Sequence, residues 1–401
     1  MPQRKDVASR SIEIICDLQE EDGGILATRT DDAYPFVYPR DGVVMTKAMS
    51  RHGLQDRSKS FYRFLNGVKR PGGEILQRYN KGYPSVSQHN EFDINPIVLH
   101  GIYDTYRMSG DKVFLENLWG LVAESAAFTV GAIDASLGLV RSVRSIHETK
   151  ELEEGYEIWT NSAAVRGLLD ASRIAAELGH QEEAEGWRAR SKSLMHSMTE
   201  RLYDREARVF LKNLRSDGTL VRAPDIAQLS PFYFRVCSDD SVLEATMRHL
   251  RMTLWRGELG GFNRFRDFEV VRDWHWYTGG TGGAWPLFTI WAAGFYDQLG
   301  MTEDAEACLD FIHRSMTEEM YIPEKVAPLR GYLAWKENET GFNDRILRGT
   351  AKVESGRFRT SIPDHAFWAC PLGWAHAEYV LLGESRERED DESELLELKA
   401  K

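Results

Sequence analysis

Helical periodicity runs through most of this chain and constrains its fold more than any other feature. In the first stretch, apolar side chains recur at helical spacing at Val7, Ile12, Ile14, Ile15 and Leu18, as expected of an amphipathic helix. The same pattern recurs at roughly 41–53, 55–67, 92–108, 113–133, 159–178, 181–203, 225–237, 240–254, 280–299, 302–317 and 366–383. About twelve helices with little strand-like alternation predict an all-α fold.

The links between these helices alternate, roughly, between short and long. Residues 109–111 and 179–181 are short links, whereas 22–40, 69–90, 137–158, 255–279 and 318–365 are long and rich in Gly, Pro, aromatic and charged residues. Long loops in a compact domain are usually functional or disordered, and the aromatic content argues against disorder. We therefore expect a helical scaffold with its long loops gathered at one end. A short hairpin is predicted from 208–211 and 219–222, around the turn at 216–218.

Composition and charge exclude several classes of partner. Of the 401 residues, 42% are hydrophobic and 28% charged, and the net charge is −12. Such an acidic chain lacks the clustered basic face of a nucleic-acid-binding protein and repels polyanions, but it is compatible with uncharged sugars. The four cysteines are scattered without metal-ligand spacing, so neither a metal nor a cofactor is expected. No secretory leader and no apolar run of ~20 residues is apparent, which predicts a cytoplasmic protein without a membrane partner.

Four constellations carry residues suited to chemistry. The first is Tyr38-Pro39-Arg40-Asp41 at a loop-to-helix junction. Asp41 there could cap the helix, or pair with Arg40 to bind sugar hydroxyls as acceptor and donor. The second is Gly155-Tyr156-Glu157-Ile158-Trp159. A carboxyl group beside aromatic rings has a raised pKa, which a general acid needs.

The third constellation runs from Trp274 to Trp285 and includes a Gly-rich turn, with Arg272 and Asp273 just before it. It has neither the Lys nor the spacing of a P-loop, so we interpret it as close backbone packing under an aromatic-walled pocket. The fourth is Pro323-Glu324-Lys325, followed by the stretch Pro371 to Tyr379. A Pro-Glu pair alone commonly just begins a helix.

Together, and in order along the chain, these pieces resemble the glucoamylase family of glycoside hydrolases. The matching stretches are Tyr38 to Asp41, Gln88 to Glu91 as a looser match, 155–161, Pro323 to Lys325 and Pro371 to Tyr379. The resemblance spans about residues 30 to 383. It implies an (α/α)6 toroid and an inverting exo-hydrolase of α-glucosides, with Glu324 as the general base.

One position departs from the family pattern. The resemblance places the general acid directly after Trp159, where this chain has Thr160 followed by Asn161. A Thr hydroxyl cannot serve as a general acid at ordinary pH. Our candidate acid is therefore Glu157, with Glu154 and Glu91 as rivals. The inserted stretch after Glu324 contains several arginines, including Arg345 and Arg348. They are either solvated loop charges, as most surface arginines are, or a site suited to an anionic sugar.

These observations lead to one main hypothesis and two alternatives. The main hypothesis is a single glycosidase domain over 1–383 with a charged tail over 384–401, acting on an oligosaccharide or glycoside. Its catalytic pair would be Glu324 and Glu157, and its substrate-binding residues Tyr38, Arg40, Asp41, Glu91, Trp159, Arg272, Trp285 and Trp374. One alternative is a sugar-binding or regulatory relative that has lost catalysis, which Thr160 favours. The other is a lyase or phosphorylase on the same toroid.

Overall fold

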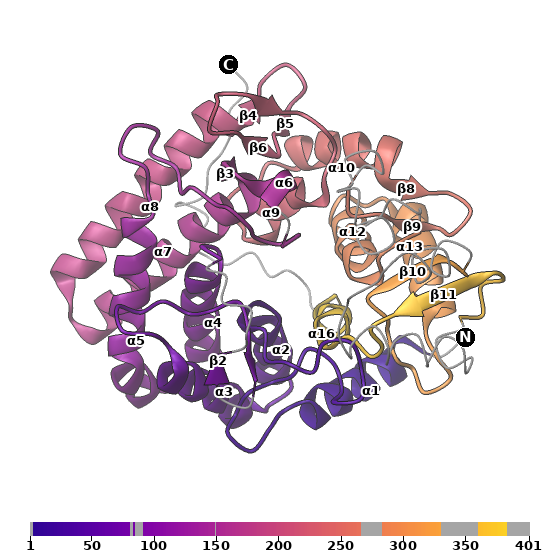
Figure 1. Ribbon diagram of the computed structural model, residues 1–401, viewed down its shortest axis with the longest axis horizontal. Helices are drawn as coiled ribbons and strands as arrows, with labels where there is room; N and C mark the ends of the chain where they lie inside the picture. Colours follow the sequence, from indigo (N-terminus) through magenta and orange to yellow (C-terminus); the bar gives the residue numbers. More distant parts are fainter. Residues whose placement is uncertain are drawn as a thin grey trace, which may run out of the picture.

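The helices form two concentric rings around a common axis, as Figure 1 shows. The structure is a computed structural model, and it describes residues 3–80, 83–84, 91–148, 150–265, 283–329 and 360–382. The inner ring contains α2 (Pro39–Arg51), α4 (Ile94–Ser109), α7 (Ile158–Leu178), the short pair η1 (Ile226–Leu229) and α9 (Ser230–Tyr233), α12 (Pro286–Gln298) and α16 (Gly373–Leu381). The outer ring contains α1 (Arg4–Asp17), α3 (Gln55–Val68), α5 (Lys112–Gly131), α8 (Gln181–Leu202), α10 (Asp240–Leu254) and α13 (Thr302–Ser315).

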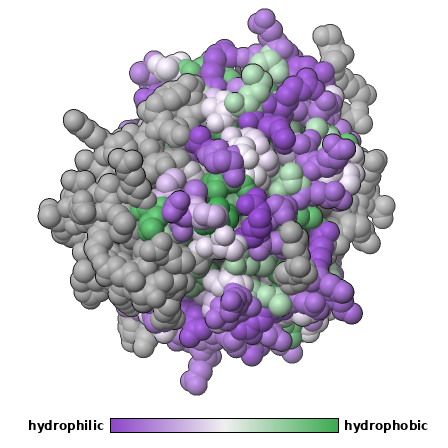
Figure 2. All heavy atoms as spheres, turned by 90° about the vertical axis from the view of Figure 1, so that its right-hand side faces the viewer, coloured by the Kyte–Doolittle hydropathy of each residue, from purple (hydrophilic) through white to green (hydrophobic). Residues whose placement is uncertain are grey.

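Burial distinguishes the two rings. In the inner helix α7, 18 of 21 residues are buried, whereas in the outer helix α8 only 6 of 22 are buried. Inner helices contact other helices on both flanks and on their outer face, so they bury nearly every side chain, including polar ones. Outer helices keep one solvated face. Figure 2 views the right-hand side of Figure 1, and hydrophilic side chains cover most of the described surface there.

Close packing joins neighbouring inner helices. A Cβ atom added at Gly167 of α7 would lie 2.4 Å from the carbonyl oxygen of Pro96 in α4, so only glycine permits this approach. The ring closes where α16 packs against α1 and α2. At that junction His376 Nδ1 lies 2.8 Å from Ser11 Oγ, and the backbone N–H of Ile322 donates to His376 Nε2 at 3.0 Å. The alternation of inner and outer helices with ring closure confirms the predicted (α/α)6 toroid.

Short strands lie within the loops that connect the helices. β3 (Tyr156–Glu157), β6 (Asn213–Leu214) and β7 (Leu220–Val221) form an antiparallel sheet. The other antiparallel pairs are β1 (Tyr79–Asn80) with β2 (Tyr83–Pro84), β4 (Tyr203–Asp204) with β5 (Val209–Phe210), β8 (Trp255–Arg256) with β9 (Gly261–Phe262), and β10 (Lys325–Pro328) with β11 (His365–Trp368). The predicted hairpin was therefore wrong in its pairing, because 220–221 pairs with 213–214 and 209–210 pairs with 203–204.

Two predicted helix boundaries also change. The stretch 366–383 begins as strand β11, and its helix starts only at Gly373, after Pro371. Helix α12 starts at Pro286, a residue well suited to a first turn, and not at 280. Helix α5 is long and apolar enough by composition to cross a membrane, but here it packs against α4 and α7. These contacts with two inner-ring helices account for the apolar side chains of α5.

Candidate active site

A cavity opens at the end of the toroid where the inner helices begin. Its lining includes the starts of α2, α12 and α16, the loop before α6 (Lys150–Glu153), and the residue that precedes β10. The lining residues are Ala27, Tyr34, Tyr38, Arg40, Asp41, Ile146, His147, Glu148, Arg264, Trp285, Leu287, Phe288, Glu324, Leu372 and Trp374. Because helix N-termini carry partial positive charge, this end of the ring favours carboxylates and other anions.

Aromatic rings form the floor of the cavity. Trp374 lines it, and beneath Trp374 the rings of Trp159 and Trp291 stack at 5.6 Å with an interplanar angle of 9°. The ring centroid of Tyr233 lies 4.4 Å from that of Trp291. The walls carry Trp285 and Phe288. Aromatic faces of this kind suit the apolar faces of sugar rings.

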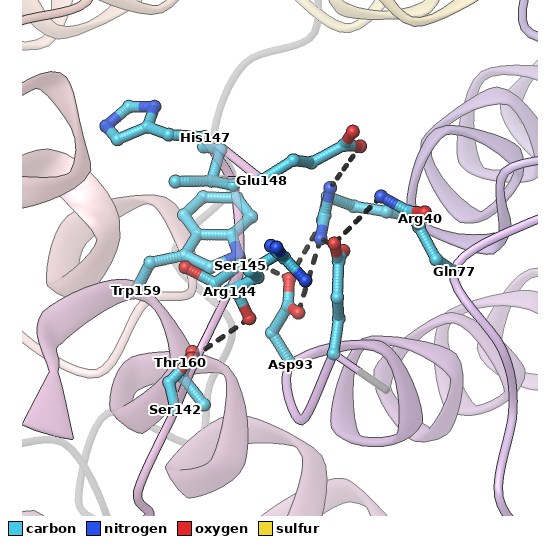
Figure 3. Close-up of polar contacts among 12 residues, drawn as sticks. Arg40, Gln77, Asp93, Ser142, Arg144, Ser145, His147, Glu148, Trp159 and Thr160 are labelled. Carbon is cyan, nitrogen blue, oxygen red and sulfur yellow. Dashed lines mark hydrogen bonds and ion pairs between the residues drawn. The ribbon is translucent and has the colours of Figure 1, made fainter. Parts of the chain in front are cut away.

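Arg40 anchors one side of the cavity (Figure 3). Its Nε donates to Asp93 Oδ2 at 2.8 Å, and its Nη2 pairs with Glu91. Its Nη1 lies 3.7 Å from Glu148 Oε1. Since Asp93 and Glu91 are completely buried behind it, most donors of Arg40 are already bound by protein. Arg40 therefore supports the cavity wall and orients Glu148, and few of its donors remain for a sugar.

Three predicted residues lie elsewhere than expected or outside the described residues. Glu91 does not line the cavity but accepts from Gln77 Nε2 at 2.9 Å and pairs with Arg40. Trp159 lies beneath the floor, where its Nε1–H donates to Asp93 Oδ2 at 2.8 Å. Arg272 falls outside the described residues, as do Arg345 and Arg348. Tyr38, Arg40, Asp41, Trp285, Glu324 and Trp374 do lie together around the cavity.

Glu324 lies at the cavity edge, directly before β10. Its backbone N–H donates to the carbonyls of Trp368 and Ala369 at 3.1 and 3.0 Å, which fixes its position. The Tyr34 hydroxyl donates to its carboxylate and in turn accepts from Trp368 Nε1 at 2.9 Å. The other carboxylate oxygen, Oε2, is buried and has no hydrogen-bond partner among the described residues. A buried acceptor of this kind fits a bound water.

The carboxyl groups of the cavity perturb one another. Burial raises the pKa of Glu324 to about 8, with Arg264 opposing the shift and the charges of Asp41 and Glu148 adding to it. Burial likewise raises the pKa of Asp41 to about 7 against the influence of Arg40. The pKa of Glu148 is also raised by burial, and Arg40, Arg78 and Arg264 oppose that shift. Raised, coupled carboxyl pKa values are common at catalytic sites.

Glu157 does not line the cavity. Its carboxylate caps α7, accepting from the backbone N–H groups of Trp159 and Thr160 at 2.8 and 2.9 Å, and its Oε2 lies 3.1 Å from Ser145 Oγ. Burial and the charge of Glu153 raise its pKa to about 8. Glu157 is therefore not placed to act as the predicted acid, because its oxygens are bound by the protein and it does not line the cavity.

The rival Glu154 does not line the cavity either, since it pairs with Arg141 at 3.2 Å on a partly exposed surface. Sequence reasoning missed Glu148. It lines the cavity with 32% of its side chain exposed, and Figure 3 shows its carboxylate directed toward Arg40. Its backbone has a positive φ of 57°, which is uncommon outside glycine. That strained residue at a cavity is a functional signal, but only coordinates reveal it.

The chemistry of the cavity depends on which groups the chain supplies there. Among the residues that the structure describes, no cluster of three or more His, Cys, Asp or Glu side chains could hold a metal ion. The four cysteines are free thiols, and Cys237, Cys308 and Cys370 are buried. Besides aliphatic side chains, the described residues that line the cavity supply carboxyl groups, arginines and aromatic rings, together with His147.

Comparisons with known proteins agree with the fold. Residues 139–343 match the mannosylglycerate hydrolase MGH1-like glycoside hydrolase domain. An uncharacterized glycosyl hydrolase of Methanocaldococcus jannaschii is 22% identical over 296 residues, which is 73% of this chain and 45% of that protein. The chain thus spans less than half the length of this curated relative.

Several solved structures share the fold. A wild-type glycosidase superposes with a TM-score of 0.69 at 19% identity, covering 94% of this chain and 95% of its own. A bacterial glucoamylase complexed with acarbose gives 0.68 at 17% identity, covering 94% and 54%. The GH63 mannosylglycerate hydrolase of Thermus thermophilus, in complex with Tris and D-glycerate, gives 0.62 at 12% identity, covering 94% and 100%.

Proposed function

Since this chain belongs to the mannosylglycerate hydrolase MGH1-like glycoside hydrolase family, we propose that it cleaves an α-linked glycoside with inversion, using Glu148 as general acid and Glu324 as general base. The observation that carries this proposal is that these two glutamates line one cavity. The carboxyl groups of Glu157, Glu154 and Glu91, by contrast, are bound elsewhere by the protein. Inverting hydrolysis needs two carboxyl groups flanking the bond, with room for a water beside the base.

The proposed reaction divides the work between the two groups. Protonated Glu148 gives its proton to the glycosidic oxygen as the bond from that oxygen to the anomeric carbon breaks. Glu324 takes a proton from the water that attacks the anomeric carbon from the opposite face. The products are the free alcohol and a sugar of inverted configuration, and the proton gained by Glu324 later returns to Glu148 through solvent.

The geometry around Glu324 suits a base. Tyr34 donates to its carboxylate, and a donor to the charged form favours ionisation. The unpartnered Oε2 supplies the acceptor that an attacking water needs. Glu148 is more open to the cavity and lies beside Arg40. Burial raises the pKa of both glutamates, so the division of roles rests on the unpartnered Oε2 of Glu324. With Glu148 available, Thr160 no longer implies a site without an acid, so we favour the hydrolase over the sugar-binding relative.

Two classes of substrate are compatible with the cavity. The resemblance to glucoamylases favours neutral α-glucosides. Arg264 favours a glycoside with an anionic substituent, such as a glyceric acid, because it lines the cavity and forms no ion pair with a carboxylate in the described part of the chain. An unpaired, buried guanidinium is a good receptor for a carboxylate.

A screen followed by NMR tests the proposal. Purified protein would be incubated with α-linked gluco-oligosaccharides and with α-glucosyl and α-mannosyl glycerates, and the anomeric protons followed from the first minutes. We expect the β-anomer to appear first from one of these classes. First appearance of the α-anomer would contradict inversion. Cleavage that requires added phosphate and yields a sugar phosphate would instead support the phosphorylase alternative.

A further inference from the structure

His147 connects the cavity to a buried ion pair. Its imidazole Nε2 lies 2.7 Å from Asp225 Oδ1, and Asp225 Oδ2 lies 2.6 Å from Lys212 Nζ. On the other side, Nε of Arg264 donates to His147 Nδ1 at 3.1 Å. At most 4% of any of these side chains is exposed. A continuous polar chain therefore runs from Lys212 to the cavity wall.

This arrangement fixes the protonation of His147. The Nε–H of arginine can only donate, so Nδ1 of His147 must accept and carries no proton. The imidazole proton then resides on Nε2 and is donated to Asp225. A doubly protonated ring would direct its Nδ1–H against the Nε–H of Arg264, and two cations would face each other in a buried place. Only the neutral ring fits these contacts.

In the pair formed by His147 and Arg264, the positive charge lies on Arg264. Arg264 also donates from Nη2 to the carbonyl of Ile146 at 3.2 Å, and its guanidinium lies 4.5 Å from the ring centre of Trp285. These contacts hold it at the cavity wall without neutralising it, because in the described part of the chain none of them is to a carboxylate. Among the described residues, the groups that act most on Glu324 are thus the Arg264 cation, the like charges of Asp41 and Glu148, and the Tyr34 hydroxyl.

We propose that His147 is a positioning residue: its neutral imidazole, protonated on Nε2, holds the Arg264 guanidinium at the wall of the cavity that Glu324 also lines, so that a fixed positive charge stands in the same cavity as the general base. The inference rests on the proposed function, since it explains how the general base is kept available. His147 would act through Arg264 and would not touch the reacting atoms. Asp225, paired with Lys212, accepts the Nε2–H of His147 and so sets its tautomer.

Two substitutions of His147 separate its two hydrogen bonds. His147→Asn places an amide oxygen near the position of Nδ1 and preserves an acceptor for Arg264. His147→Gln places an amide N–H near the position of Nε2, which preserves the donor to Asp225 but removes that acceptor. In ligand-free protein with ¹³C-labelled glutamate, the Glu324 carboxyl resonance is assigned by its loss in Glu324→Gln.

We expect the titration midpoint of Glu324 to rise by ~0.5–1 pH unit in His147→Gln and to stay within ~0.2 in His147→Asn, since an ion at cavity distance contributes about this much. Arg264→Gln should raise it at least as far. The double variant His147→Gln/Arg264→Gln should shift no further than Arg264→Gln alone. A merely structural role for His147 would lower stability without this pattern.

An unchanged midpoint in His147→Gln, with a raised midpoint in Arg264→Gln, would overturn the proposal. If His147→Gln does not fold, ¹⁵N shifts of the histidines in the unaltered protein decide. A bare Nδ1 and a protonated Nε2 at pH 7 support the proposal, and a protonated Nδ1 refutes it. Both readouts use ligand-free protein, so they stand whether or not hydrolysis is found. Absence of hydrolysis would count against the proposed function alone.

Discussion

The hydroxyl of Ser145 lies 3.1 Å from Oε2 of Glu157, and it also donates to Glu153 Oε1 at 2.7 Å. Glu153 accepts in addition from the backbone N–H groups of Ser145 and His147 at 2.8 and 2.7 Å. Two buried carboxylates therefore bind the loop that ends at Glu148. Glu153 and Glu157 therefore support the loop that carries Glu148, the candidate acid, and neither of them is the acid itself.

Loss of the α7 cap should reduce stability. Glu157→Ala removes the acceptor for two backbone N–H groups, and we expect the free energy of unfolding to fall by about 1–2 kcal/mol. Urea denaturation monitored by circular dichroism measures this change. Glu154→Ala is the matched control, because its partly exposed ion pair should contribute less than about 1 kcal/mol. Equal losses in the two variants would contradict the capping role.

Removal of the proposed base should affect turnover and leave binding largely unchanged. We expect Glu324→Gln to lower kcat by ~10²–10⁴, the usual contribution of a general base. KM should change little, because the amide retains the shape of the carboxyl group. Steady-state kinetics on the best substrate of the screen measures both constants. Unaltered kcat would remove Glu324 from the mechanism.

The raised pKa of Glu324 has a consequence for stability. A carboxyl group with a pKa of about 8 in the folded protein and about 4.3 in the unfolded chain binds its proton more tightly when folded. It therefore destabilises the fold progressively as pH rises between these values. Glu324→Gln should raise Tm by up to ~6 °C at pH 9 and leave it unchanged at pH 4. A gain in Tm that is independent of pH would contradict this reading.

The opposite sign applies to His376 at the ring closure. Burial lowers its pKa to about 3, while an unfolded histidine titrates near 6.5. The unfolded chain therefore binds an extra proton between these values, and stability falls as pH falls through this window. In His376→Gln, the loss of unfolding free energy between pH 7 and pH 4 should be smaller than in the unaltered protein. An identical loss would show that His376 is already charged when folded.

Much of the fold could be predicted because it depends on local patterns. The helical spacing from Ile158 to Leu178, ended by Gly179, predicted α7 almost to the residue. The apolar run around Phe367 fits either a helix or a strand, and only its pairing with β10 makes it a strand.

The site was predictable where the chain itself juxtaposes residues, as at Arg40 and Asp41. Glu148 was not predictable in this way. Its position depends on a left-handed backbone and on contacts from Glu153 and Glu157, and no local pattern marks either feature. Glu157 lies beside Tyr156 and Trp159 in sequence, a pattern that predicts a general acid, but its carboxylate instead caps α7.

The role of Glu148 as general acid is tested most directly by a series of aryl and alkyl glycosides of the preferred sugar. A good leaving group needs little protonation, so loss of the acid matters only for poor ones. We predict that Glu148→Gln retains near-normal kcat/KM on a dinitrophenyl glycoside and loses ~10²–10⁴ on an alkyl glycoside. Glu157→Gln should keep the leaving-group dependence of the unaltered enzyme. A steep new dependence in Glu157→Gln, with none in Glu148→Gln, would contradict the account.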